Sequence, residues 1–452
     1  MPYSENTQAL SATTAQVIHG SKPYLTFDNG VTKVTTTDGL LGITISDGTT
    51  QTTYTPANNT STASNPIVLL KENQSFTDIG MMVPPAKNAI DLSDLIGAPY
   101  NNWGDDDGDG QGTNGVTATG HLTVYITDKD NLAVVHPSAR LDICKAPYKV
   151  ELTSTGGSLI TQYGLPNSSS FSDGTATYYI SPSVPKICYA RPNLAFGTAN
   201  YAGPADIWSL DKGFLAQSTE SSSYSRNFPT TGANNLRFDL LAGGIDASTL
   251  TWPAVTQGGI TATMTLSPPN DGSFNPDGAS SVRVTLTGPA ATEAQINSDS
   301  PGRVATPTLP QQFELVGYDS NNKAVLKYGF VLKRWFVNRG EKRANAFNQS
   351  SWCRNLGGGY RLPQVKDLTN AVRSGAVGAT PSSDGNYYQR NIGAGLFPEW
   401  GDLFNYPAAG FTYDTYWTSD SDGSNQFDVY SLSGEVQSYN PFNSILGVCV
   451  YP

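Results

Sequence analysis

The sequence is poor in charge and has no long apolar run. Only 14% of its 452 residues are charged, and 27 Lys and Arg against 38 Asp and Glu give a net charge of −11. This acidic balance argues against binding to nucleic acid or anionic lipid, because both require a basic face. No segment approaches the ~18 to 20 consecutive apolar residues that cross a bilayer. We therefore expect neither a nucleic-acid-binding protein nor a transmembrane segment.

Residues that commonly carry enzymatic chemistry are also scarce. The chain has three histidines, His19, His121 and His136, and none forms an HxxE or HxxxH pair. No Gly-x-Ser-x-Gly nucleophile motif or glycine-rich phosphate loop occurs. The paired carboxylates of a glycosidase leave no linear signature, so that class stays open. The sequence predicts a binding protein that is not an enzyme and requires no cofactor.

The four cysteines favour disulfides over a metal site. Cys144, Cys188, Cys353 and Cys449 are widely spaced, and no CxxC occurs. An even number of distant cysteines is typical of disulfide-bonded extracellular proteins. Three connectivities are possible, and the local one, 144–188 with 353–449, would close each bridge inside one domain.

Composition also favours an extracellular protein, secreted or displayed at the bacterial surface. Gly is abundant, at 45 residues, and only four Met occur. The segment from Met1 to Asn6 lacks the basic and apolar regions of a secretory signal. The chain is therefore either cytosolic or exported by a signal outside this sequence, and the composition favours export.

The period of the apolar residues divides the chain into modules. Residues 1–20 are polar and are expected to form a disordered leader. Residues 21–230 contain short alternating runs, such as 41–45 and 122–126, which predict antiparallel strands. We expect a β-rich domain there, with an immunoglobulin-like fold as one interpretation and a disulfide between Cys144 and Cys188.

A second module is expected over residues 231–325. The runs 260–266 and 282–286 alternate between apolar and polar residues, on either side of a Pro/Gly turn. Strands with such connections over about 90 residues are typical of an immunoglobulin-like β-sandwich.

In the last module, residues 326–452, the spacing of apolar residues changes, and helices are predicted as well as strands. A capping-box spacing at Asn338 and Glu341 predicts a helix to about Leu356. A second helix is predicted from Pro363 to Gly375. Strands are expected at 328–332, 335–337, 416–418, 427–430 and 447–451.

This module resembles a C-type-lectin-like domain. The residues that carry the resemblance are Cys353 in the segment 346–353, Gly358 to Pro363, Tyr416 to Ser419, and Val448 to Val450. Such a module behind a β-sandwich is similar to the tip of the intimin and invasin adhesins of Gram-negative bacteria. The resemblance implies a mainly β, multidomain chain with a C-terminal α+β domain closed by a Cys353–Cys449 disulfide.

The resemblance also implies a function. We expect an adhesin-type protein that binds a host surface protein through its C-terminal tip. One alternative partner is a bacterial outer-membrane barrel, and another function is carbohydrate binding or glycan degradation. Calcium-dependent sugar-binding members carry Glu-Pro-Asn or Gln-Pro-Asp followed by Trp-Asn-Asp. This chain instead has Pro398-Glu399-Trp400 and Trp417-Thr418-Ser419-Asp420, so calcium-mediated sugar binding is not expected.

Charge is distributed unevenly inside this module. The ten Lys and Arg from Lys333 onward all precede residue 391, and residues 391–452 hold seven acids, no base and thirteen aromatics. Aromatic side chains supply rigid contact area, and carboxylates between them would select a basic partner. The predicted partner-binding residues are Trp400, Asp402, Phe404, Tyr406, Asp420 and Asp422.

A run of acids in the first module is the only candidate metal site. Asp105, Asp107 and Asp109, followed by Gly110, match the first half of an EF-hand-like loop. The twelfth position is Val116 where an EF-hand has Glu. A structural calcium ion and a solvated acidic turn are both open here.

Overall fold

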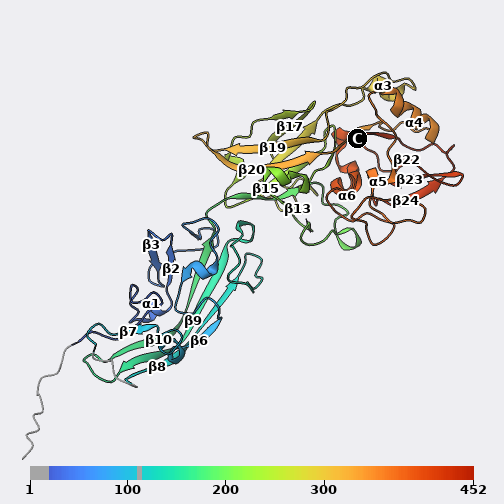
Figure 1. Ribbon diagram of the computed structural model, residues 1–452. Coiled ribbons are helices and arrows are strands. Elements are labelled where there is room, and N and C mark those ends of the chain that lie inside the picture. Colours follow the sequence, from blue (N-terminus) through green and yellow to red (C-terminus); the bar gives the residue numbers. More distant parts are fainter. Residues whose placement is uncertain (1–19, 109–114) are drawn as a thin grey trace, which may run out of the picture. The chain divides into compact units, whose positions relative to one another are not determined.

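The computed structural model describes residues 20–108 and 115–452 (Figure 1). The chain is mainly β, as the sequence predicts, and it divides into two compact units, Met1–Val184 and Pro185–Pro452. The predicted leader therefore lies almost wholly outside the described residues. Within those residues, no helix has the length and apolar character required to cross a membrane.

The first unit is built on long antiparallel strands. The strands of its largest described sheet, in spatial order, are β4 (Ile67–Val68), β10 (Ser168–Ser181), β9 (Tyr148–Thr161), β8 (Val116–Thr127) and β6 (Ala89–Asp91). Smaller sheets contain β3 (Gln51–Tyr54), β2 (Ile43–Ser46) and β5 (Ile79–Gly80), and β1 (Tyr24–Leu25) with β7 (Trp103–Gly104). Two short helices, α1 (Thr37–Leu40) and α2 (Leu92–Ile96), complete the unit.

The core of this unit follows from the alternation in the sequence. Alternate residues of β8 and β9, such as Leu122, Val150 and Leu152, are buried in one apolar cluster. The β2–β3 turn contains Gly48 at a φ of 87°, a conformation that glycine adopts without steric cost. Apolar residues at every second position therefore predict these strands well.

The second unit contains a large antiparallel sheet. Its described strands, in spatial order, are β12 (Trp208–Ser209), β13 (Gly213–Leu215), β11 (Lys186–Arg191), β15 (Arg237–Gly243), β18 (Val282–Thr287), β17 (Ile260–Leu266) and β16 (Val255–Gln257). A hairpin of β19 (Gln311–Tyr318) and β20 (Ala324–Leu332) lies against this sheet in the sandwich (Figure 1).

The structure places the first boundary earlier than the sequence suggested. Strands β11, β12 and β13 precede residue 231 but belong to the sheet of the second unit. Cys144 lies in the first unit and Cys188 on β11 of the second. Both are disulfide-bonded, and none of the described cysteines is free. Alternation identified the strands here, but it carries no information on which sheet a strand joins.

The C-terminal part of the second unit combines short helices with two small sheets. The described helices are α3 (Glu293–Asn297), α4 (Ala346–Asn355), α5 (Val365–Leu368) and α6 (Leu396–Trp400). One sheet has the order β14 (Thr231–Ala233), β21 (Arg334–Asn338) and β25 (Val448–Tyr451). The other, the outer sheet, has the order β22 (Thr415–Asp422), β23 (Asn425–Tyr430) and β24 (Val436–Tyr439).

Both predicted helices are shorter than expected. Helix α4 begins after Asn345, whose side chain accepts a hydrogen bond from the Asn348 amide, so the predicted cap at Asn338 is wrong. Asn338 instead belongs to β21. Helix α5 ends at Leu368, whereas the sequence predicts a helix to Gly375. Local spacing therefore overestimated these helices. Asn345 caps α4 locally, and after α5 the Thr369 hydroxyl donates to the distant Gly434 carbonyl (2.9 Å).

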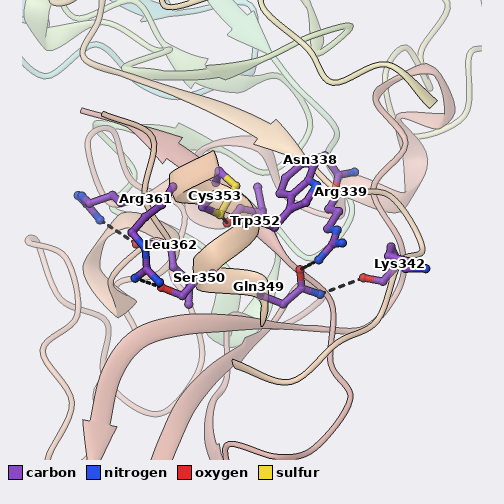
Figure 2. The surroundings of a disulfide bond; sticks show 12 residues. Asn338, Arg339, Lys342, Gln349, Ser350, Trp352, Cys353, Arg361 and Leu362 are labelled. Atoms are coloured by element: carbon purple, nitrogen blue, oxygen red, sulfur yellow. Dashed lines mark hydrogen bonds between the residues drawn. A yellow bond between two sulfur atoms is a disulfide. The ribbon is translucent and has the colours of Figure 1, made fainter. Parts of the chain in front are cut away.

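A disulfide between Cys353 and Cys449 connects α4 to β25, as the sequence predicts (Figure 2). Close to it, the buried Gln349 accepts a hydrogen bond from Arg339 (3.0 Å) and donates one to the Lys342 carbonyl (2.9 Å). The Arg339 guanidinium lies over the Trp352 ring, 5.0 Å from its centroid. Helix α4 is thus fixed on both sides by covalent and polar contacts.

The sandwich and the C-terminal module share one continuous apolar cluster that reaches from Ile187 to Val450. At its centre lies Glu399 of α6, which is fully buried. Its carboxylate accepts hydrogen bonds from the amides and hydroxyls of Thr230 and Thr231 (2.6–3.1 Å) and from the Gly393 amide (2.8 Å). Burial raises the pKa of Glu399, and these donors oppose the rise.

A buried cation holds the same junction. Arg390 is fully buried and donates to the carbonyls of Asn193, Ala195 (2.9 Å) and Phe196 (3.3 Å). Its guanidinium lies 4.5 Å from the centroid of the Trp208 ring. These contacts join segments about 190 residues apart in sequence. We conclude that the two predicted modules of this unit form one packed body.

Replacement of the buried carboxylate tests this junction. In Glu399→Gln, an amide NH₂ faces donors that need an acceptor, so we expect the free energy of unfolding to fall by about 2–4 kcal/mol. Glu435→Gln, a half-buried glutamate in the same module, should change it by less than ~0.5 kcal/mol. Urea unfolding of both variants checks this. An equal midpoint for wild type and Glu399→Gln would contradict the role of Glu399.

Removal of the Cys353–Cys449 disulfide tests the contribution of chain closure. The bridge spans 96 residues of sequence, for which the chain-entropy model gives a loss of about 4.7 kcal/mol in the double alanine variant. Denaturant titration measures this loss. Phe347→Ala, an exposed change on the same helix, is the control and should leave stability within ~0.5 kcal/mol. A double variant as stable as the control would refute the closure argument.

Candidate functional site

Three of the six predicted partner-binding residues are buried in the junction. The Trp400 side chain is fully buried and donates to the Thr231 carbonyl (3.1 Å). Tyr406 is also fully buried, and its hydroxyl accepts from the Asn193 amide (2.9 Å). Asp402 is 8% exposed and accepts from the Phe404 amide (3.1 Å). Their assignment to a contact surface is corrected, because their polar groups serve the interior.

The remaining predicted acids lie elsewhere on β22. Asp420 accepts a hydrogen bond from the Val365 amide (2.7 Å), so it completes the N-terminus of α5. Asp422 is exposed at the far end of the strand. At ~3.3 Å per residue, it lies ~23 Å along the strand from Thr415, near which Phe404 packs. The six residues therefore do not form one surface, and of them only Phe404 belongs to the site described next.

Exposed aromatic rings gather at the Thr415 end of the outer sheet. Phe404 is 56% exposed and Tyr413 is 49% exposed. The Phe404 and Tyr413 ring centroids lie 6.4 Å apart, and those of Tyr413 and Tyr430 lie 5.6 Å apart, both in edge-to-face geometry. We call Phe404, Tyr413 and Tyr430 the aromatic row. Rings held edge to face present apolar area with little rotational freedom.

A pocket of about 540 Å³ adjoins the aromatic row and is called the acidic pocket. Its functional lining residues are Arg343, Asp414, Tyr430, Glu435, Gln437 and Tyr439. Tyr430 belongs to both features, so the row and the pocket form one continuous surface.

The acidic pocket is lined by more negatively than positively charged side chains. Arg343 forms an ion pair with Asp414. Burial by itself would raise the pKa of Asp414, but the hydrogen bond from Arg343 lowers it, and the pKa is lowered overall. Glu435 forms no salt bridge within the part of the chain that the structure describes. The pocket therefore carries an excess of negative charge over its single paired arginine.

Two further aromatic side chains extend this surface. Phe442 is 83% exposed and Phe347 is 71% exposed. A hydrogen bond of 3.0 Å from the Ala346 amide to the Pro441 carbonyl holds the backbone of the two segments together. Asn443 and Ser444, which follow Phe442, line the acidic pocket. Large exposed rings beside one pocket are typical of a protein-binding surface.

The candidate calcium site is not tested by these contacts. Asp109 lies outside the described residues, whereas Asp105 and Asp107 are described. The Ser21 hydroxyl donates to Asp107 (3.5 Å), and the neighbouring Asp106 pairs with Lys33 (2.6 Å). Among described residues, no three potential ligands are arranged to hold a metal ion. A structural calcium ion stays a prediction.

Sequence reasoning located the acidic, aromatic region but missed most of the residues that form its surface. Tyr430 and Tyr439 were not selected, although they follow the alternation of β23 and β24, and neither was Glu435, which precedes β24. Phe427 and Val429 are buried on one face, so Asp428 and Tyr430 must point to the other. That period-two signal could have separated surface rings from core rings.

The separation of surface from core is testable by alanine substitution. Trp400→Ala removes a fully buried ring and should lower the free energy of unfolding by about 3–5 kcal/mol. Phe404→Ala and Tyr413→Ala should each lower it by less than ~1 kcal/mol, because these rings remain exposed. Thermal and urea unfolding measure both effects. A loss for Phe404→Ala as large as that for Trp400→Ala would place Phe404 in the core.

Comparisons with known proteins give similarity only at the level of solved structures. No family model and no curated protein matches the chain. The chain is similar to the structure of invasin, described as a bacterial integrin-binding protein, with 15% identity, 75% of this chain covered and a TM-score of 0.35. This chain spans about half of that invasin chain, 51% of its length.

Two intimin structures show a similar degree of likeness. A C-terminal 282-residue fragment of intimin, solved with the intimin-binding domain of the translocated intimin receptor, is 12% identical, with 74% of this chain and 93% of the fragment covered and a TM-score of 0.33. An intimin mutant of EHEC O157:H7 is 14% identical, with 50% and 89% covered and a TM-score of 0.28.

Proposed function

We propose that this chain is an adhesin-type protein that binds a host surface protein through its C-terminal module. The observation that carries the proposal is the surface formed by the aromatic row and the acidic pocket. Phe404, Tyr413 and Phe442 expose about half or more of their side chains on one module. Exposed rings beside a site of net negative charge suit a partner that presents apolar and basic side chains.

The scaffold beneath this surface is rigid, which favours binding. The outer sheet packs on a core that contains Trp417 and Phe427, both fully buried. The disulfide connects α4 to β25 within the module, and the buried Glu399 and Arg390 hold the module to the sandwich. A pre-organised contact surface loses little conformational freedom on association. The sandwich then serves as the support that carries the binding module.

We infer in addition that the module is C-type-lectin-like but does not use calcium. Helix α4, the short α5 and the bridge from α4 to the last strand support the lectin-like assignment. Glu399 stands in the segment where sugar-binding members carry their calcium motif. Its carboxylate is buried and held by Thr230, Thr231 and Gly393. It is therefore not available to a calcium ion, which favours a protein partner over a sugar.

An extracellular location completes the proposal. None of the described cysteines is a free thiol, which suits an oxidising compartment. Invasin is described as integrin-binding and intimin was solved with its translocated receptor. The proposed partner of this chain is of the same kind, a protein exposed on a host cell.

Binding of the labelled full chain to cultured host cells tests the proposal. We expect saturable binding that is lost after mild protease treatment of the cells and retained after enzymatic removal of their glycans. The double variant Phe404→Ala/Tyr413→Ala should bind at least ~10-fold more weakly, because it removes two exposed anchors. Leu266→Ala, with a 63% exposed side chain on β17, is the matched control and should bind like wild type.

The opposite outcomes identify the alternatives. Binding that survives protease but not deglycosylation would indicate a glycan ligand. Binding to purified bacterial outer membranes and not to host cells would indicate a bacterial partner. Undiminished cell binding by the double variant would move the contact surface away from the aromatic row.

A further inference from the structure

A buried carboxyl without a partner lies on the same sheet face as the acidic pocket. Asp428 of β23 is fully buried. Neither of its carboxylate oxygens has a hydrogen-bond partner within the described part of the chain. A buried polar group in that condition is rare and calls for an explanation, because its desolvation is not compensated by hydrogen bonds.

The strand register fixes the direction of this side chain. Asp428 lies opposite Gln437 on β24, and Tyr430 lies opposite Thr415 on β22. Cross-strand partners share a face, and so do residues two apart on one strand. Gln437, Tyr430 and Thr415 all line the acidic pocket. The Asp428 side chain therefore projects from the same sheet face as these pocket residues. It does not itself line the pocket, and the fully buried Trp417 lies opposite it on β22.

The groups around Asp428 compensate its charge only in part. The Thr415 hydroxyl pulls its pKa down but makes its hydrogen bond to Asp414 (3.4 Å). Arg373 also pulls it down, but this guanidinium donates to the Val436 carbonyl and lies over Phe427, on the other face. The charge of Asp414 acts in the opposite direction. Burial prevails and raises the pKa of Asp428 to about 7.

We propose that the acidic pocket receives a lysine or arginine side chain of the protein partner, whose charge is met by Glu435 at the rim and by Asp428 on the same sheet face. This inference rests on the proposed function and specifies the chemistry of the partner. Tyr430 and Tyr439 supply aromatic walls, which attract cations through their ring faces. Arg343, the pocket's own cation, is already paired with Asp414. The negative charge that remains selects a basic group.

Protonation of Asp428 would make this recognition sensitive to pH. A cation that requires the ionised carboxylate binds in proportion to the ionised fraction. With a pKa of about 7, that fraction rises about 10-fold from pH 6 to pH 8, and the affinity rises with it. Affinity rises with pH because the incoming positive charge stabilises the ionised carboxylate, so binding releases a proton from Asp428.

The test uses the full chain and small probes of defined charge. N-acetyl-arginine methylamide is the cationic probe, and the citrulline analogue is its neutral control of the same shape. Isotope-edited NMR of the aspartate carboxyl carbons follows Asp428, whose signal is identified by its loss in Asp428→Asn. We expect the arginine probe to bind at least ~10-fold more tightly than the citrulline probe at pH 8, and to move the Asp428 titration to lower pH.

Variants separate the effect of the Asp428 carboxyl on binding from the effect of the pocket's overall negative charge. Asp428→Asn should lower affinity for the arginine probe about 10-fold at pH 8 and remove its pH dependence. Glu435→Gln, a surface change that spares the fold, should lower affinity about 3-fold and keep the pH dependence. Asp422→Asn, at the far end of β22, should leave both unchanged and is the matched control. If Asp428→Asn does not fold, the wild-type titration and Glu435→Gln still decide the question.

Two results would overturn the inference. Equal affinity for the arginine and citrulline probes would show that the pocket does not recognise charge. A pH dependence that persists in Asp428→Asn would exclude Asp428 as the group that meets the cation. Either result leaves the cell-binding effect of Phe404→Ala/Tyr413→Ala intact, so failure of the cation pocket and failure of the binding surface are distinguishable.

Discussion

The second unit depends on one buried interaction, the carboxylate of Glu399 with the amides and hydroxyls of Thr230 and Thr231. A carboxylate in an apolar interior is costly, and it is tolerated only where several donors converge on it. The donors here come from the segment that enters β14, and the acceptor comes from α6, so neither part can satisfy its polar groups without the other. This mutual requirement explains why the sandwich and the C-terminal module share a core.

The fold was largely predictable where apolar residues recur at a regular spacing. Alternation identified the strands at 260–266 and 282–286, and the structure pairs Met264 with Val284 in register. The Cys353–Cys449 bridge was predicted as the local pairing of the three possible ones and by the resemblance to a C-type-lectin-like domain. Sheet membership was not predictable, since β11 and β14 join partners far along the chain. The start of α4 was missed because Asn345, and not Asn338, caps it, and the end of α5 was missed because Thr369 bonds to the distant Gly434 carbonyl.

The candidate site was predictable in composition but not in position. Residues 391–452 are acidic and aromatic, and the surface does form within that module and largely from those residues. Trp400 and Tyr406 have the same side-chain chemistry as Tyr413, yet they are fully buried while Tyr413 is 49% exposed. The buried and exposed rings differ only in the direction of their side chains. The irregular segment 401–414 has no regular spacing of apolar residues from which that direction could be predicted. In β23 and β24 the period exists, and there the exposed set follows from it.

The rigidity of the core and the polarity of the outer sheet are connected. Glu399 and Arg390 stabilise the module at its junction with the sandwich, and the disulfide connects α4 to β25 within the module. A module held in this way tolerates a destabilising group at its periphery, such as a carboxyl buried without a partner. Asp428 is that group, and its position on the same sheet face as residues of the acidic pocket means that a ligand, and not the fold, can supply the missing charge. Stability at one end of the module thereby permits an unsatisfied recognition site at the other.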